Sequence, residues 1–122
     1  MKPSFFNMDD HELISKFVTI AQGRGAAVTN LDSERANRLI GQMRAIDREL
    51  RRRGRSARLE LAPLLHHRDR FVRYYAALYL LGLLSNESRA VLEWNAKYGA
   101  DSLAADARMY LRSLDDGSYQ PD

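Results

Sequence analysis

Arginines on one stretch of the chain are the residues whose type and spacing best suit binding chemistry. Residues 34–54, ERANRLIGQMRAIDRELRRRG, place them at helical spacing, so that they form one stripe. The stripe consists of Arg44, Arg48, Arg51, Arg52 and Arg55, and Arg53 and Arg58 extend it around the following turn. Each guanidinium offers a planar fork of donors that suits phosphates or carboxylates. The stripe is therefore a candidate surface for an acidic protein or for nucleic acid.

The same arginines also have acidic neighbours of their own. Three acid-to-base pairs stand four residues apart in the favourable direction: Glu34–Arg38, Asp47–Arg51 and Glu49–Arg53. No aromatic residues interleave with the stripe to make a stacking platform for bases. Three interpretations therefore stay open: a solvated, self-paired face, a surface for an acidic protein partner, and a surface for nucleic acid.

Arg73 and Tyr74 are the second candidate binding pair. Asp69 stands where it can cap a helix, and Arg73 follows one turn later, within reach of its carboxylate. That spacing favours a structural role for Arg73. The alternative is that Tyr74 emerges beside Arg73 at the edge of a groove, because contact hot spots favour tyrosine and arginine.

Catalytic and metal-binding patterns find little support in this chain. There is no cysteine, and Gly23-Arg24-Gly25 lacks the Lys-Ser/Thr ending of a phosphate-binding loop. His66 and His67 are adjacent, so on a helix they point about 100° apart and do not chelate as histidines four residues apart do. We therefore expect no catalytic residue, no metal and no cofactor.

Six helices and no strand are predicted as the elements that position these side chains. Their expected ranges are 10–22, 31–53, 56–66, 69–84, 86–98 and 102–114. The expected caps are Asp9 for the first helix, Asn30 or Asp32 for the second, and Asp101 or Ser102 for the sixth. Gly23 and Gly25 are expected to end the first helix, with a loop over residues 26–30. Pro63 is expected to kink the third helix. The fourth is apolar nearly all round and should lie in the middle of the fold, and the fifth should bury Trp94 or Asn95, together with Tyr98.

The composition is that of an ordinary globular protein. The chain has 122 residues, of which 45% are hydrophobic and 29% charged, and its net charge of +3 permits an acidic partner. We expect a single domain over residues 1–122, with a core at about 10–114 and a frayed tail at 115–122. The N-terminal segment lacks the apolar core of a signal peptide, and no apolar run is long enough to cross a membrane. We therefore expect a cytoplasmic protein that does not associate with membranes.

The segment over residues 61–84, LAPLLHHRDRFVRYYAALYLLGLL, resembles a HEAT repeat. With residues 34–54, 88–99 and 105–114, the chain looks like a small bacterial family of HEAT-like, armadillo-type helical domains whose function is not assigned. The resemblance implies an all-α fold, a right-handed stack of about three antiparallel helical hairpins, or αα-superhelix. It brings no catalytic residues with it.

Together these observations predict a non-catalytic protein-interaction module that binds an acidic surface of a partner protein. The candidate contacts line the groove formed by the second helix of each hairpin: Arg44, Arg48, Arg51, Arg52, Arg73 and Tyr74. The family context implies an immunity-type or adaptor protein. We expect it to be a monomer or a weak homodimer. The alternative function is nucleic-acid binding through the basic ridge from Arg44 to Arg58.

Overall fold

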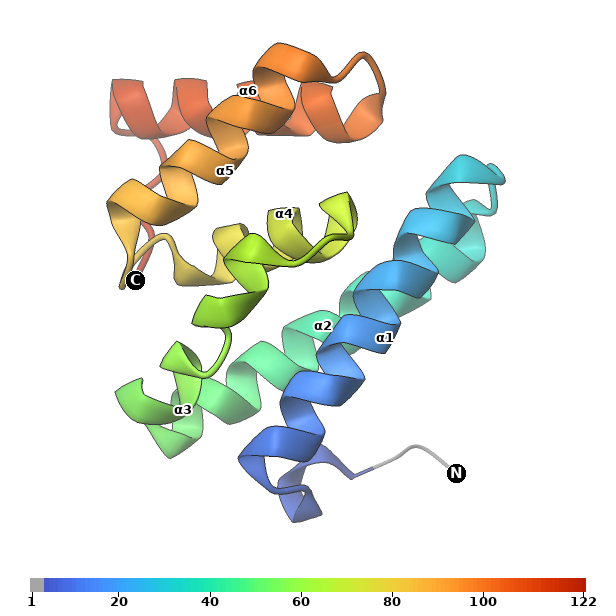
Figure 1. The fold of residues 1–122 in the computed structure, drawn as a ribbon, viewed down its shortest axis with the longest axis vertical. Coiled ribbons are helices and arrows are strands. Elements are labelled where there is room, and N and C mark those ends of the chain that lie inside the picture. Colours follow the sequence, from blue (N-terminus) through green and yellow to red (C-terminus); the bar gives the residue numbers. More distant parts are fainter. Residues whose placement is uncertain (1–3) are drawn as a thin grey trace.

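The computed structural model describes residues 4–122, and all regular structure in that range is helical (Figure 1). Residues 1–3, part of the predicted domain and of the segment tested for a signal peptide, lie outside it. The six α-helices are α1 (Asp10–Thr29), α2 (Ser33–Arg53), α3 (Arg55–Leu59), α4 (Arg70–Leu80), α5 (Ser85–Tyr98) and α6 (Ser102–Asp116). Two short 3-10 helices, η1 (Phe5–Asn7) and η2 (Ala62–His66), complete the described range. The predicted all-α class with six helices is confirmed.

Aspartates begin four of the α-helices. Asp9 accepts a hydrogen bond from the Glu12 amide at 2.8 Å and forms a complete capping box with that residue at the start of α1. Asp32, Asp69 and Asp101 accept hydrogen bonds from backbone amides at the starts of α2, α4 and α6, without a capping box. Asp9 and Asp69 were predicted as caps, because an N-cap is a local signal, and of the alternatives for α2 and α6 the structure has Asp32 and Asp101.

The first helix continues past the glycines that were expected to end it. α1 runs through Gly23 and Gly25 to Thr29, so the predicted loop over residues 26–30 is wrong. Gly25 is buried, and a Cβ atom there would lie 2.7 Å from the ring of Phe71. The missing side chain at Gly25 therefore allows close approach of the start of α4, and does not terminate α1.

The third predicted helix is broken rather than kinked. α3 ends at Leu59, and Pro63 lies in the first turn of η2. Proline has no backbone N–H to donate to the carbonyl of residue 59, so one continuous helix would lose that bond. α4 likewise ends four residues earlier than predicted, and a tight turn over residues 81–84 leads into α5.

α4 lies in the middle of the molecule, as predicted, and packs against α1, η2 and α5 (Figure 1). α1 packs along α2 on one side of it, and α5 packs against α6 on the other. The core between these layers is built from fully buried side chains that include Phe17, Met43, Ile46, Val72, Leu80 and Leu92. None of the helices within residues 4–122 combines the length and apolar character needed to cross a bilayer.

The C-terminal segment packs on the molecule where fraying was expected. α6 extends to Asp116, and Gly117 closes it with a left-handed backbone, φ 79°. The ring of Tyr119 lies 5.6 Å from that of Tyr110, measured between centroids. Asp122 then pairs with Arg51 at 3.0 Å, so the segment returns to α2.

Candidate functional site

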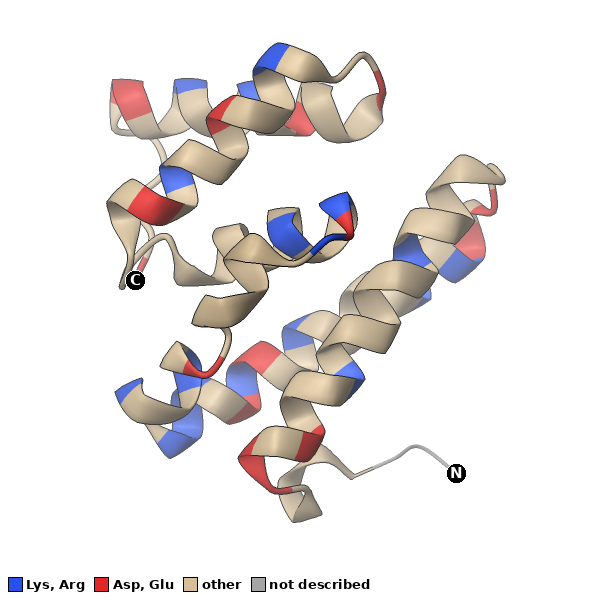
Figure 2. Cartoon of the chain, viewed as in Figure 1, with Lys and Arg blue, Asp and Glu red and all other residues tan. Residues whose placement is uncertain are grey.

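The C-terminal part of the arginine stripe is paired within the molecule. Arg51 Nε donates to Asp47 Oδ2 at 2.8 Å, which confirms one predicted pair. Glu49 accepts from Arg53 Nε at 2.7 Å, which confirms a second, and from Arg52 Nη2 at 2.6 Å. These two hydrogen-bonded guanidinium groups lower the pKa of Glu49 to about 2. Figure 2 shows basic and acidic residues interleaved along α2.

The N-terminal part of the stripe remains available. Arg44 and Arg48 are exposed, and neither forms an ion pair with any residue in the range 4–122. The third predicted pair, Glu34–Arg38, is also absent from that range. Arg55, at the other end of the stripe, is likewise exposed and forms no ion pair in that range, so the stripe offers a ligand three unpaired guanidinium groups.

Tyr74 does not reach the surface. Its side chain is 1% exposed and packs edge-on against Tyr75, with ring centroids 5.1 Å apart. Burial raises the pKa of its hydroxyl group. The prediction that Tyr74 contacts a partner is therefore wrong, because the helix register turns this side chain into the core.

Arg73 does lie at the surface, but it does not pair with Asp69 as predicted. Its Nη1 donates to the carbonyl oxygens of His67 at 2.8 Å and Arg68 at 3.0 Å. The Asp69 carboxylate instead caps the amides at the start of α4. The guanidinium of Arg73 lies over the ring of Trp94, 5.2 Å from its centroid.

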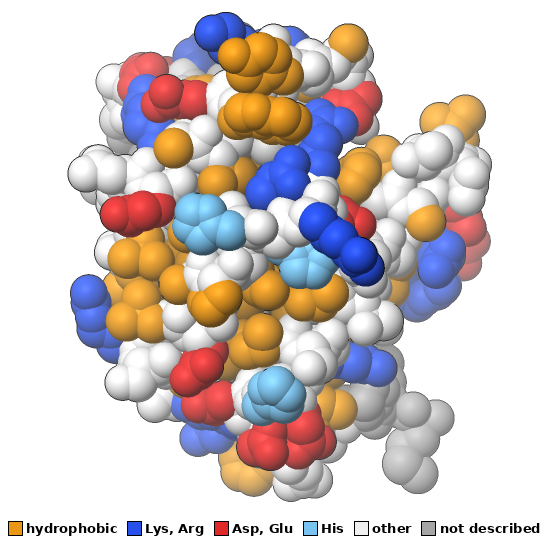
Figure 3. Space-filling model, in the orientation of Figure 1, with side chains coloured by type: hydrophobic (Ala, Val, Ile, Leu, Met, Phe, Trp, Pro, Cys, Tyr) orange, Lys and Arg blue, Asp and Glu red, His pale blue; other side chains and the backbone are white. Residues whose placement is uncertain are grey.

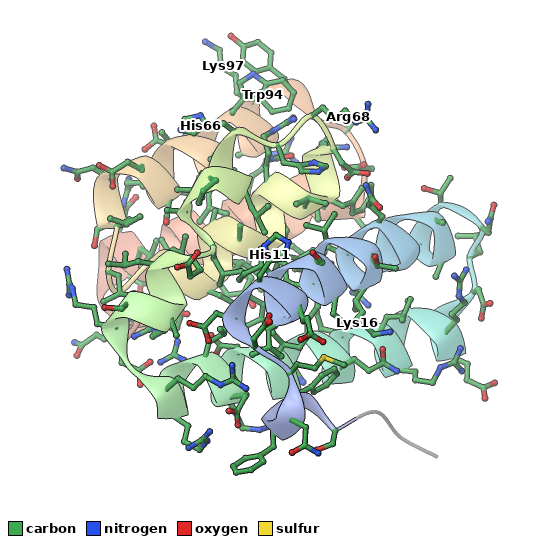
Figure 4. All side chains as sticks on the ribbon, turned by 60° about the horizontal axis from the view of Figure 1, so that its bottom comes forward. His11, Lys16, His66, Arg68, Trp94 and Lys97 are labelled. Atoms are coloured by element: carbon green, nitrogen blue, oxygen red, sulfur yellow. The ribbon has the colours of Figure 1, made fainter. Side chains whose placement is uncertain are left out.

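Beside Arg73, a hollow of about 640 Å³ opens between η2 and α5. Its apolar wall consists of Leu65, Ala90, Val91 and Trp94. Its polar rim consists of His66, His67, Arg68, Arg73 and Glu87. In Figure 4 the labelled His66, Arg68, Trp94 and Lys97 gather on this side of the molecule, whereas His11 and Lys16 lie apart on α1.

Two aromatic rings on α5 extend this surface. Trp94 is 47% exposed and Tyr98 is 64% exposed, and their ring centroids lie 5.5 Å apart. Lys97 covers the ring of Tyr98 at 5.2 Å, as Arg73 covers Trp94. Figure 3 shows hydrophobic side chains flanked by basic ones over α5. The prediction that Tyr98 is buried is wrong, and of the two alternatives Trp94 and Asn95 it is Asn95 that lies in the core.

Arg70 fixes the position of α5, a role that the sequence reasoning missed. Its Nε donates to Asn95 Oδ1 at 2.8 Å, and its two terminal nitrogens donate to the Asp101 carboxylate at 2.6 and 2.8 Å. This fork lowers the pKa of Asp101, the N-cap of α6, to about 2. The partners lie 25 and 31 residues away, so no local pattern indicates them.

The histidines do not converge. Within the described range, no three side chains of the types His, Cys, Asp and Glu lie close enough together to hold a metal ion. His67 Nδ1 instead accepts the Asp69 amide at 2.9 Å, and His66 is exposed at the end of η2. These contacts make His67 part of the turn that leads into α4.

Comparisons with known proteins place the whole fold in a family. A family model described as "Domain of unknown function (DUF2019)" matches residues 11–115. The chain is similar to the crystal structure of the protein RPA1889 from Rhodopseudomonas palustris CGA009, with a TM-score of 0.92 and 30% sequence identity. The match covers 99% of this chain and 100% of that one. No curated protein matches the chain.

Proposed function

The chain belongs to the DUF2019 family of domains of unknown function, and we propose that it is a non-catalytic protein-interaction module. The observation that carries the proposal is the exposed pair of rings Trp94 and Tyr98, of which Trp94 lies against Arg73 and forms part of the wall of an apolar hollow. Aromatic residues and arginine are enriched at interface hot spots. Large aromatic side chains left exposed side by side on a single helix are typical of a contact surface.

The arrangement of the helices supports a HEAT-like assignment within this proposal. The pairs α1–α2, η2–α4 and α5–α6 each pack together, and α4 joins the outer pairs. Helical repeats of this kind act by presenting surface. An immunity-type or adaptor protein of the bacterial cytoplasm is the specific form that we propose, and the lack of cysteine is compatible with that reducing compartment.

Nucleic-acid binding through the ridge from Arg44 to Arg58 is the second candidate function. Arg44 and Arg48 support it, because both are exposed and neither has an ion-pair partner in residues 4–122. Against it, Arg51 and Arg52 already pair with carboxylates. The two functions differ in salt dependence, since a ligand held by several phosphates is lost steeply as salt rises.

The proposal is tested by affinity capture from native lysate, with and without nuclease, followed by mass spectrometry. We expect one captured protein that is still recovered after nuclease treatment. The Trp94→Ala variant should fail to capture it, whereas Met109→Ala, a control of similar exposure on α6, should capture it normally. Binding of that protein, once purified, should show the same pattern. Recovery of only nuclease-sensitive material, lost when Arg44 and Arg48 are both changed to Glu, would replace the proposal with nucleic-acid binding.

A further inference from the structure

We propose that the hollow between η2 and α5 receives an apolar side chain of a partner protein segment whose neighbouring residues are Asp or Glu. The inference rests on the proposed function and adds the partner's chemistry to it. It is carried by the apolar wall of the hollow, the fixed guanidinium at its rim and the surrounding charge.

The wall of the hollow suits an aliphatic or aromatic side chain. Leu65 is almost fully buried beneath it, while Val91 and Trp94 leave part of their apolar surface to solvent. A volume of about 640 Å³ exceeds that of one large side chain, so a short segment, not a single group, is needed to cover it. Covering this surface removes apolar area from water, which favours binding.

Arg73 is held ready for a carboxylate. Its Nη1 is bound to two backbone carbonyls, and its Cζ lies over the Trp94 ring, so the group has little freedom left to lose. Its other donors, Nε and Nη2, have no acceptor among residues 4–122. A carboxylate is the planar acceptor that such a fork binds best.

The charge around the hollow favours an anionic partner. Arg68 is exposed on the rim and Lys97 on the next turn of α5, and neither forms an ion pair within the described chain. Glu87 is the acidic residue of the rim, and Glu93 on the same helix pairs with Arg89 at 2.9 Å. Complementary charge of this kind speeds encounter and selects acidic partners.

The same features disfavour a single-stranded nucleic acid at this place. Bases stack on open aromatic faces, and Arg73 covers one face of Trp94 while Lys97 covers one face of Tyr98, so fewer faces are open to bases. The two rings are also inclined to each other by 47°, so successive bases would not stack on both.

The test is selection of peptides from a phage-displayed random dodecapeptide library on the whole immobilised protein. The selected peptides are then synthesised and titrated into the protein in solution. Trp94 is the sole tryptophan, so its fluorescence reports occupancy of the hollow. We expect the selected peptides to contain an apolar residue flanked by Asp or Glu, and we expect their binding to change the fluorescence emission of Trp94. The variants Arg68→Glu and Ala90→Glu, both at exposed positions, should each weaken binding about tenfold or more.

Arg112→Glu is the matched control, because it makes the same charge change on α6 at an exposed residue outside the hollow. Selected peptides without acidic residues, or a loss of peptide affinity in Arg112→Glu as large as in Arg68→Glu, would overturn the inference. Selected peptides that bind without changing Trp94 emission would also overturn it, but the proposed interaction function would remain. An oligothymidylate that changes Trp94 emission and is lost with Arg68→Glu would replace the peptide by nucleic acid.

Discussion

At the scale of single residues, Glu49 shows how one carboxylate links the fold to pH. Arg52 and Arg53 hold its pKa at about 2, below the usual 4.5. Between those pH values the unfolded chain binds more protons at this site than the native protein, so stability falls as the pH falls. Above pH 4.5 the contribution is fully present, and by pH 2 most of it is lost.

We therefore expect Glu49→Gln to lower the free energy of unfolding at pH 7 and to flatten its decline between pH 4.5 and 2. Urea unfolding at a series of pH values, followed by circular dichroism, measures both effects. Glu60→Gln is the control, since Glu60 is exposed and forms no ion pair in the described chain. If the free energy of unfolding of Glu49→Gln declines between pH 4.5 and 2 as steeply as that of the unchanged protein, Glu49 is not the source of this pH dependence.

Two helical glycines are expected to respond oppositely to the same substitution. At Gly25 a Cβ atom would lie 2.7 Å from the Phe71 ring, and this overpacking should outweigh the gain in helix propensity, for a net loss of about 1–2 kcal/mol. At Gly41 nothing lies within 4 Å, so Gly41→Ala should stabilise by about 0.5–1 kcal/mol. Chemical denaturation of both variants decides the matter, and stabilisation by Gly25→Ala would show that Phe71 moves aside.

At the scale of elements, local signals were predicted well and tertiary contacts were not. The caps Asp9 and Asp69 could be found from sequence because each bonds amides two or three residues away. The end of α1 could not, because Gly25 serves a contact with Phe71. The register of α5 was also ambiguous: Asn95 rather than Trp94 is buried because Arg70 satisfies its amide oxygen. The hollow beside Trp94 therefore could not be predicted from hydrophobic periodicity alone.

The segment after α6 should contribute to stability, since it packs where a frayed tail was predicted. Tyr119 is half-buried against Tyr110, and aromatic pairs add about 0.5–1.5 kcal/mol beyond their buried area. Tyr119→Ala should therefore lower the free energy of unfolding by at least about 1 kcal/mol. Gln120→Ala, at the exposed neighbour, is the control. Equal stability of the two variants in urea would mean that the segment is held too weakly to matter.

At the scale of the whole molecule, the hollow exists only while α5 keeps its place beside η2 and α4. One wall comes from η2 and the other from α5, and the turn over residues 81–84 is the short covalent link between α4 and α5. Arg70 adds a second link, because it joins the start of α4 to Asn95 near the end of α5 and to the cap of α6. The candidate site thus depends on a residue that lies outside it.

Arg70→Ala should accordingly release the last two helices from the rest of the fold. The substitution leaves Asn95 Oδ1, on a residue that is 0% exposed, without its donor, and it leaves Asp101 without its fork. An unsatisfied buried polar group costs about 1–3 kcal/mol, and the lost charge-assisted bonds add to that. Arg70→Lys keeps the charge without the planar fork, so it should recover only part of the loss.

The measurement for Arg70 is hydrogen exchange read helix by helix, together with urea unfolding. Arg70→Ala should speed exchange in α5 and α6 more than in α1 and α2, because only the former lose an anchor. Arg89→Ala is the matched control: it removes an arginine from α5 that pairs with Glu93 and Asp115 at the surface, where such pairs contribute about 0–1 kcal/mol. If Arg70→Ala speeds exchange in all helices alike, the α5–α6 pair does not open separately, and the hollow is as stable as the core itself. If exchange rises in α5 and α6 alone, the interaction surface can open without unfolding of the core, and Arg70 sets how often it does.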